Sequence, residues 1–337
     1  MKSRLLEYLA CPTCEGEIRL LESSLSDGAE ILEGQLSCAG CLQRFPIVRG
    51  VPRFADLQSV DPEKAATASS FGFEWKHFTQ EDERYGDQLL GWIAPVKPDF
   101  FEGKVILDGG CGKGRHMLLA SGWGARDVIG IDLSDAVDSA FAATRSAENM
   151  HVVQCDICHL PFKRVFDYAF TVGVIDHIPE PVVGFRSLAS KIRLGGHLSV
   201  WVYGAENNGW IINFVNPIRE RFTSQMNPRT LLHLSKVPTA AVYAASKLLF
   251  GPLSKFSLGN MIVKRLFYSD YLISLARFGW REQHTIVFDH LVAPTAHYVG
   301  RQEFEEWWKG IGATETIIGW HNKNSWRGFG RTNGFAG

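Results

Sequence analysis

Between residues 104 and 204 the chain alternates short apolar runs with helix-like stretches. The runs begin near Val105, Val128 and Leu198, and several of them end in a carboxylate or a glycine. Short continuous apolar runs are typical of buried parallel strands, and their alternation with helical patterns indicates βαβ units. This pattern predicts an α/β fold built around a parallel sheet.

Four of the seven cysteines form two C-x-x-C pairs near the N-terminus, Cys11 with Cys14 and Cys38 with Cys41. Each pair places two thiolates on one side of a tight turn, and two facing turns complete a closed site of four sulfur ligands, which suits structural zinc. The residues between the pairs predict a β-hairpin. A segment of about fifty residues buries little apolar surface, so a metal would supply the missing stability. A thioredoxin-like redox site is disfavoured, since it needs one such pair at a helix start.

The apolar run at residues 105–107 ends in Asp108 and is followed by a turn containing Gly110, Gly112 and Gly114. A strand, a glycine-rich turn and a helix start bring the backbone close to a ligand and aim N–H groups at negative charge. The dinucleotide fingerprint would need a third glycine where the chain has an arginine. The phosphate loop would need Ser or Thr after its lysine, so it fails as well.

The remaining pattern, D-x-G-x-G-x-G, resembles the first motif of class I S-adenosylmethionine-dependent methyltransferases, in a form similar to methyltransferase type 11. Later landmarks follow in order: Asp132 ends a second strand, Asp156 a third, and the turn at residues 194–196 leads into a fifth. The resemblance covers residues 104–203. It implies an enzyme that uses S-adenosylmethionine. It also implies a Rossmann-like sheet of seven strands, the last of which runs antiparallel.

The same resemblance assigns roles at the cofactor site. An acid at the end of the second strand can accept hydrogen bonds from both ribose hydroxyls of an adenosine. The acid after the third strand would lie beside the adenine amino group, and the next residue would pack on the ring. The expected cofactor-binding residues are Asp108, Gly110, Gly112, Gly114, Asp132, Leu133, Asp156, Ile157 and Val172.

Three residues are candidates for the chemical step. His177 is the first candidate for a general base, because it follows the fourth strand, which the family places beside the reacting methyl. Relatives commonly carry two histidines at this turn, and here Asp176 takes the place of the first. His297 belongs to a segment that resembles the family's late substrate-facing loop. The alternative for each is a packing role alone.

Charge is distributed unevenly along the chain, although 35 Lys+Arg against 36 Asp+Glu leave a formal net charge of -1. That balance excludes a uniformly basic nucleic-acid binder. The ribbon segment has more acidic than basic residues, whereas residues 205–288 have an excess of basic residues, which suits a lid over a charged acceptor. We therefore expect methyl transfer to a small-molecule or glycan-type acceptor, with nucleic acid disfavoured but left open. A tRNA- or protein-directed methyltransferase and an inactive cofactor-binding scaffold are the alternatives.

The chain shows neither a signal peptide nor an apolar run long enough to span a membrane, which predicts a cytoplasmic, soluble protein without a transmembrane segment. The complete expected fold is a seven-stranded methyltransferase sheet with a small N-terminal zinc-ribbon domain and a helical lid insert. The expected organisation is a zinc ribbon at 1–56, a linker with an aromatic helix or flap at 57–103, a cofactor-binding core at 104–204, the lid insert at 205–288 and a sheet-completing segment at 289–337.

Overall fold

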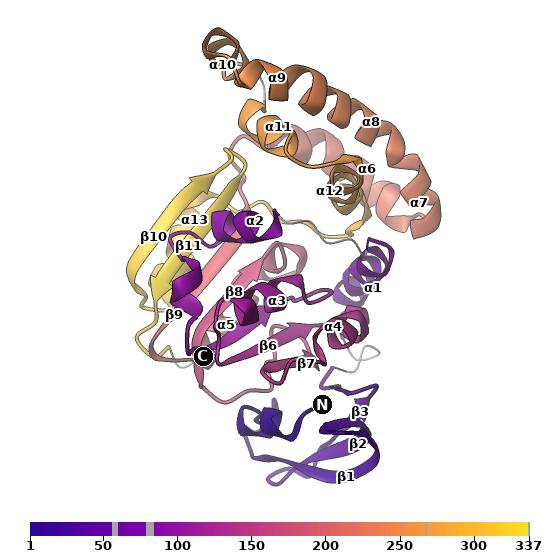
Figure 1. Ribbon diagram of the computed structural model, residues 1–337, viewed down its shortest axis with the longest axis vertical. Helices are drawn as coiled ribbons and strands as arrows, with labels where there is room; N and C mark the ends of the chain where they lie inside the picture. The colour runs from indigo at the N-terminus through magenta and orange to yellow at the C-terminus, as the bar shows by residue number, and fades with distance from the viewer. Residues whose placement is uncertain (56–59, 79–83, 267, 336–337) are drawn as a thin grey trace.

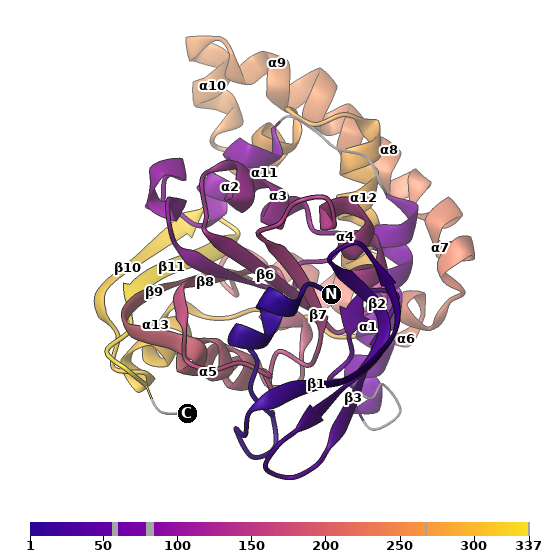
Figure 2. The same ribbon diagram turned by 60° about the horizontal axis from the view of Figure 1, so that its bottom comes forward.

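The computed structural model describes residues 1–55, 60–78, 84–266 and 268–335. A seven-stranded sheet with surrounding helices forms the centre of the molecule (Figure 1). A small four-stranded sheet lies at one end, and a group of helices forms the other end. Turning the molecule brings the small sheet to the front and the distant helices to the back (Figure 2).

The large sheet has the strand order β10-β11-β9-β8-β5-β6-β7. Its strands are β5 (Val105–Gly109), β6 (Asp127–Asp132), β7 (Met150–Gln154), β8 (Phe166–Val172), β9 (Ile192–Tyr203), β10 (Thr314–His321) and β11 (Ser325–Arg331). Strands β5 to β9 pair in parallel, whereas β11 runs antiparallel to both β9 and β10. The predicted seven-stranded sheet with an antiparallel last strand is confirmed.

Both faces of the sheet are buried at β5 to β8, which explains why these strands are mostly apolar, whereas β10 at the edge is largely exposed. Alternate residues of β5 enter different cores: Val105 and Leu107 face one, and Ile106 faces the other. The first core contains residues of α5 and α13, and the second contains residues of α3 and α4. These helices are α3 (Arg115–Gly122), α4 (Ala136–Thr144), α5 (Pro181–Lys191) and α13 (Arg301–Gly310).

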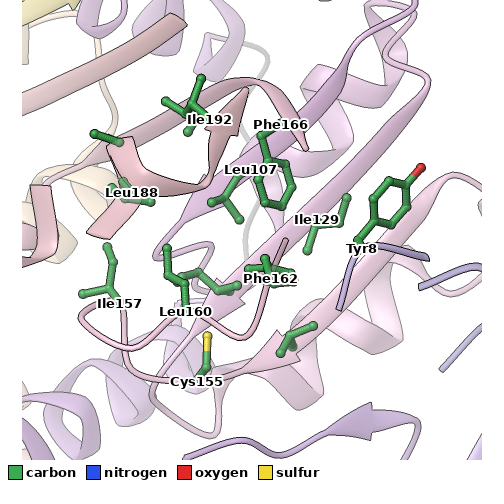
Figure 3. Close-up of a cluster of buried hydrophobic side chains, with 14 of the residues drawn as sticks. Tyr8, Leu107, Ile129, Cys155, Ile157, Leu160, Phe162, Phe166, Leu188 and Ile192 are labelled. Carbon is green, nitrogen blue, oxygen red and sulfur yellow. The ribbon is translucent and has the colours of Figure 1, made fainter. Parts of the chain in front are cut away.

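Residues 1–52 form the small domain, which we call the ribbon. It contains the 3-10 helix η1 (Ser3–Glu7) and the antiparallel strands β1 (Ile18–Asp27), β2 (Glu30–Cys38), β3 (Arg44–Val48) and β4 (Val51–Pro52). The hairpin predicted between the cysteine pairs is confirmed as β1–β2. The apolar core of the ribbon is continuous with one core of the large sheet, so that Tyr8 shares a cluster with Ile129 and Phe162 (Figure 3).

Two helices lie between the ribbon and the large sheet in the sequence, α1 (Pro62–His77) and α2 (Tyr85–Trp92), followed by the 3-10 helix η2 (Pro98–Phe101). The polar stretch at 55–68, taken from the sequence as a linker, is helical from Pro62 onwards. The Asp61 side chain caps this helix by accepting from the backbone N–H groups of Glu63 and Lys64. The expected boundary between residues 56 and 57 lies outside the described residues.

Residues 211–266 form a row of helices that we call the helical arm. Its elements are η4 (Ile211–Val215, a π-helix), α6 (Asn216–Arg221), η5 (Thr223–Gln225), α7 (Pro228–Leu234), α8 (Lys236–Ala244), η6 (Ala245–Phe250, a π-helix), α9 (Gly251–Ser254) and α10 (Ser257–Val263). Helices α11 (Ser269–Leu275) and α12 (Trp280–Val292) pack beneath it. Helix α12 therefore crosses the expected lid boundary at residue 288. Among the described residues, none of the helices has the length and apolar character needed to span a bilayer.

Candidate functional site

A cavity of about 850 Å³ opens at the carboxyl ends of the parallel strands. It extends from β5, β6 and β8 to α11 and α12, and residues of α1 and α2 also line it. Open α/β sheets bind their ligands at this edge. The residues predicted from the sequence that line the cavity are Gly110, Asp132, Leu133, Asp156, Ile157, Val172 and His177. The lining does not include Asp108, Gly112, Gly114, Asp176 or His297.

Two positions of the glycine-rich turn after β5 leave no space for a side chain. Gly110 has a φ of 91°, and a Cβ added there would lie 2.3 Å from a methyl carbon of Val174. Gly112 has a φ of 52°, and its added Cβ would lie 2.8 Å from the Trp75 ring. Only glycine combines a positive φ with such close packing. The turn can therefore present its backbone to a ligand in the cavity.

Asp132 ends β6 and is held by its own surroundings. Its carboxylate accepts from the backbone N–H of Gly112 at 2.9 Å and from the backbone N–H and hydroxyl of Ser134 at 2.8 and 2.7 Å. Burial nevertheless raises the pKa of Asp132. The hydrogen bonds fix the carboxylate between the glycine-rich turn and the start of α4. Oδ1 accepts both bonds from Ser134, whereas Oδ2 accepts only the bond from Gly112 and keeps a lone pair that could accept from a ligand hydroxyl.

Asp108 lies on β5, where it is almost fully buried. Burial, and then the charge of Asp132, raise the pKa of Asp108 to about 8. One of its carboxylate oxygens has no hydrogen-bond partner among the described residues. A carboxyl group that keeps its proton near neutral pH can donate a hydrogen bond as well as accept one.

Asp156 follows β7 and connects the cavity to helix α1. Its carboxylate accepts from Lys64 Nζ at 2.8 Å and from the backbone N–H of Cys158 at 2.9 Å. Burial acts to raise the pKa of Asp156, but these two hydrogen bonds outweigh it, and the pKa is lowered overall. The neighbouring Ile157 presents an apolar side chain to the same end of the cavity.

The donors and acceptors at this end fit an S-adenosylmethionine molecule. Asp132 Oδ2 could accept from a ribose hydroxyl, and a carboxylate oxygen of Asp156 could accept from an adenine amino group. Leu133, Ile157 and Val172 supply apolar surface for the ring. Because the glycine positions of the glycine-rich turn carry no side chain, its backbone N–H groups could approach the part of the cofactor beyond the adenosine.

His177 lies in η3 (Ile175–His177), just beyond β8, and its ring lines the cavity. Its Nδ1 atom lies 2.7 Å from the carbonyl oxygen of Thr295, which can only accept a hydrogen bond. The proton is therefore on Nδ1, and Nε2 keeps a lone pair. The ring also packs edge-on against Phe71 and Tyr203.

Asp176 and His297 lie next to His177 but are turned into the protein. The Asp176 carboxylate accepts from the backbone N–H of Tyr203 at 3.3 Å, and burial raises its pKa. The backbone N–H of His297 donates to the Asp176 carbonyl oxygen at 2.7 Å. Through Asp176, these two bonds tie η3 to the end of β9 and to the segment after α12. Asp176 and His297 therefore stabilise the part of the cavity wall that contains His177.

Two acids line the cavity wall: Glu74, which the sequence did not single out, and Asp289, which belongs with His297 to the segment expected to face the substrate. Glu74 of α1 is 2% exposed, and Asp289 of α12 lies close enough to interact with it electrostatically. Burial raises the pKa of Glu74 well above its usual range and that of Asp289 to about 6. The two helices are more than two hundred residues apart in the sequence. No local motif could have paired them.

Aromatic and cationic side chains line the cavity beyond His177. Trp92 and Trp201 lie with ring centroids 5.6 Å apart, and Trp201 also packs against Tyr203. Arg84 and Arg277 line the same cavity, and the guanidinium of Arg84 lies over the Phe278 ring. Flat aromatic faces next to guanidinium groups suit a ligand that combines a ring system with negative charge.

The four ribbon cysteines come together as predicted, with their sulfur atoms within 4.8 Å of one another. Cys11 and Cys41 have sulfurs 3.6 Å apart, and those of Cys14 and Cys38 are 3.4 Å apart. A tetrahedral zinc site with Zn–S bonds of about 2.3 Å places its sulfurs roughly 3.8 Å apart. Backbone N–H groups of Cys41 and Gly40 donate to Cys38 Sγ and lower the pKa of Cys38 to about 6, which favours the thiolate that a metal needs.

Comparison with known families matches two parts of the chain. A family model described as a methyltransferase domain matches residues 107–200, which contain the glycine-rich turn and His177. A second model, described as Trm112p-like protein, matches residues 2–50, which contain the four cysteines.

The chain is also similar to proteins named tRNA U34 carboxymethyltransferase. The one from Pseudoalteromonas translucida is 32% identical over 157 residues, which cover 45% of this chain and 47% of that protein. The one from Psychromonas ingrahamii is 33% identical over 132 residues, 37% of this chain and 39% of that protein. The chain therefore spans less than half the length of these curated relatives. Among solved structures, magnesium protoporphyrin IX methyltransferase from Synechocystis PCC 6803 matches 81% of this chain and 99% of its own, with 12% identity and a TM-score of 0.45.

These matches contradict the expectation of a small-molecule or glycan acceptor and of a protein that avoids nucleic acid. The relatives are named for tRNA, and the ribbon matches a family named after Trm112. The expectation was wrong because it judged nucleic-acid binding from the net charge of the ribbon. Cations that line the cavity, such as Arg84 and Arg277, come from other parts of the chain. The chain thus joins a Trm112p-like, four-cysteine ribbon to a class I S-adenosylmethionine-dependent methyltransferase domain.

Proposed function

We propose that this chain is an S-adenosylmethionine-dependent methyltransferase that modifies a nucleotide of tRNA. One observation carries the proposal: a single cavity joins the carboxylates Asp132 and Asp156 at one end to aromatic and cationic side chains at the other. The similarity to tRNA U34 carboxymethyltransferases supports RNA as the acceptor class. The bound cofactor would supply an electrophilic methyl group on its sulfonium.

We assign separate roles to the residues that would bind the cofactor and to those that would bind the acceptor. The glycine-rich turn, Asp132 and Asp156 would bind the cofactor, and the apolar side chains between them would keep water away. Trp92 and Trp201 would stack on a base turned out of its helix, as enzymes that act on bases require. Arg277 would pair with a phosphate near that base.

His177 is the proposed general base. The carbonyl of Thr295 holds the proton on Nδ1, so Nε2 is free to take a proton from an acceptor N–H or O–H. Asp176 and His297 are proposed as positioning residues that fix the wall behind this ring. The four ribbon cysteines are proposed to bind one structural zinc ion. A role in tRNA modification would place the protein in the cytoplasm.

The test uses labelled S-adenosylmethionine and two acceptors, unmodified tRNA transcripts and a total protein extract. We expect label on tRNA only, and mass spectrometry of the digested nucleosides then distinguishes a methyl from a carboxymethyl group. The variant His177→Gln should lower kcat by roughly 100-fold or more while the affinity for the cofactor stays unchanged. His233→Gln is the matched control, because His233 of α7 is exposed and does not line the cavity. Label on protein and none on tRNA would overturn the proposal.

A further inference from the structure

The helical arm carries an unusual number of large apolar side chains on its outer surface. Six of them are 64% to 78% exposed: Phe214, Phe222, Val237, Leu248, Phe256 and Leu258. They are distributed from η4 to α10, along the edge of the molecule that lies farthest from the ribbon (Figure 1). Large exposed apolar patches are uncommon on monomeric proteins and mark surfaces that bind something.

These side chains form stripes, as expected for one face of a helix. Along α8 and η6 the exposed positions Val237, Ala241, Ala244 and Leu248 recur at spacings of four and three residues. The opposite face is held by the rest of the protein. There the Gln283 amide donates to the hydroxyl of buried Ser246 at 2.9 Å. The outer stripe is therefore not needed to attach the arm.

The charges on the arm are almost all positive. Residues 211–266 contain eight Lys or Arg and one acid, Glu220 of α6. Exposed cations among them, such as Lys255, Lys264 and Arg265, lie beside the exposed apolar residues of α9 and α10. A helical face with bulky apolar side chains flanked by Lys and Arg is typical of helices that lie on anionic lipid bilayers.

Two other occupants fit this surface less well. RNA offers phosphates to the cations, but it gains nothing from aliphatic side chains such as Val237 and Leu248. A second copy of the chain would bring the same cationic face against itself in a symmetric contact, with Glu220 as the only acid of the arm to pair with. An anionic bilayer satisfies both features at once, because its headgroups pair with the cations and its acyl region accepts the apolar side chains.

We propose that the helical arm binds the surface of an anionic lipid bilayer. Phe214, Leu248 and Phe256 enter the boundary between headgroups and acyl chains, and Lys255, Lys264 and Arg265 contact lipid phosphates. The protein lies on the membrane and does not cross it. This proposal concerns a different surface from the catalytic cavity, so it does not depend on the acceptor proposed above.

The test is sedimentation of the full chain with vesicles. Two compositions are compared: phosphatidylcholine alone, and phosphatidylcholine with about one third phosphatidylglycerol. We expect strong binding to the anionic vesicles and much weaker binding to the neutral ones. The double variant Leu248→Gln/Phe256→Gln should lower the partition coefficient by roughly tenfold or more. Lys255→Gln/Lys264→Gln should lower it by roughly 10- to 30-fold on anionic vesicles only.

Leu194→Gln is the matched control, because Leu194 is also highly exposed but lies at the start of β9, away from the arm. Its binding should equal that of the wild type. Unchanged cofactor affinity in every variant checks that the fold is intact. Failure of the wild type to bind anionic vesicles overturns the proposal, as does equal loss in the control. A double variant that weakens tRNA binding or dissociates a dimer, with vesicle binding unchanged, also overturns it and assigns the arm to RNA or to self-association.

Discussion

The ribbon and the helical arm lie at opposite ends of the molecule, and they use their charged and apolar residues in different ways (Figure 1). The ribbon has both signs of charge, and two of its arginines, Arg4 and Arg49, pair with acids of the methyltransferase domain. Asp127 of β6, fully buried, accepts from Tyr8 Oη and from the Arg4 guanidinium, both at 2.6 Å. The arm has eight cationic residues against the single acid Glu220, and it exposes large apolar side chains on its outer surface. The net charge of a region does not predict what that region binds, because the groups that its charged side chains contact decide this.

The two regions also differ in what stabilises them. The ribbon shares an apolar core with the large sheet and is proposed to contain a metal site (Figure 3). The arm depends on a small separate cluster that includes Leu231, Leu232 and Phe288. We therefore expect substitutions at buried ribbon positions to cost stability, and substitutions on the outer arm to change binding alone.

The largest effect is expected at the cysteine cluster. Structural zinc contributes on the order of 10 kcal/mol to the folding of small domains. Cys38→Ser should therefore release the metal and unfold β1 to β3, which is measured by elemental analysis and by loss of hydrogen-exchange protection. Cys158→Ser is the control, because this half-buried thiol lies outside the cluster. An unchanged zinc content in Cys38→Ser would falsify the assignment.

The next largest effect is expected where the ribbon contacts β6. Asp127→Asn removes a buried charge that Arg4 and Tyr8 contact, and it should lower the free energy of unfolding by roughly 3 kcal/mol. Burial acts to raise the pKa of Asp127, but hydrogen bonds from His151 and Tyr8 outweigh it and lower the pKa overall. A lowered pKa means that this stability is present above about pH 4 and is lost as the pH falls through the folded-state pKa.

Denaturant unfolding across a pH series tests this contact. The difference between wild type and Asp127→Asn should be largest near neutral pH and should shrink in acid. Glu15→Gln is the control, since Glu15 is highly exposed and its ion pair with Lys191 is on the surface. A difference that is the same at every pH would show that the carboxylate charge is not what joins the two domains.

A third effect concerns the cofactor end of the cavity, which belongs to neither region. Asp132→Asn keeps the shape of the side chain but removes its charge, and it should weaken S-adenosylmethionine binding by about 1.5–3 kcal/mol. Since burial raises the pKa of Asp132, the wild type should lose affinity at a higher pH than an exposed carboxyl would allow. Calorimetry measures both effects. Asp135→Asn, which changes an exposed acid nearby, should have wild-type affinity, and equal affinity in Asp132→Asn would exclude the ribose role.

The sequence predicted those parts of the structure that depend on neighbouring residues. The glycine turn after Asp108, the strand end at Asp132 and the two C-x-x-C pairs each combine residue type and spacing within a few positions. Helix α13 and strand β11 lie within residues 289–337, the segment that the sequence assigns to completion of the sheet. Local backbone chemistry and periodicity are sufficient for such features.

The acceptor end of the cavity was beyond the reach of such patterns. Glu74 and Trp92 come from the consecutive helices α1 and α2, whereas Asp289 comes from α12 much later in the sequence, and only the folded chain brings them to the same cavity. Helix α1 was itself missed at its start, because the capping residue Asp61 lies in a polar stretch that was taken as a linker. The outer stripe of the arm was also hidden, since the sequence does not tell which leucines are buried.

The smallest effect on stability is expected on the outer arm. Leu248 is 78% exposed, so Leu248→Ala removes little buried surface and should change the free energy of unfolding by less than about 0.5 kcal/mol. The matched substitution Leu9→Ala removes the same atoms from a fully buried ribbon position and should cost about 2–5 kcal/mol. Denaturant unfolding of both variants against the wild type measures this contrast. A large loss in Leu248→Ala would mean that the outer stripe stabilises the fold, and the difference between the two regions would then be one of degree.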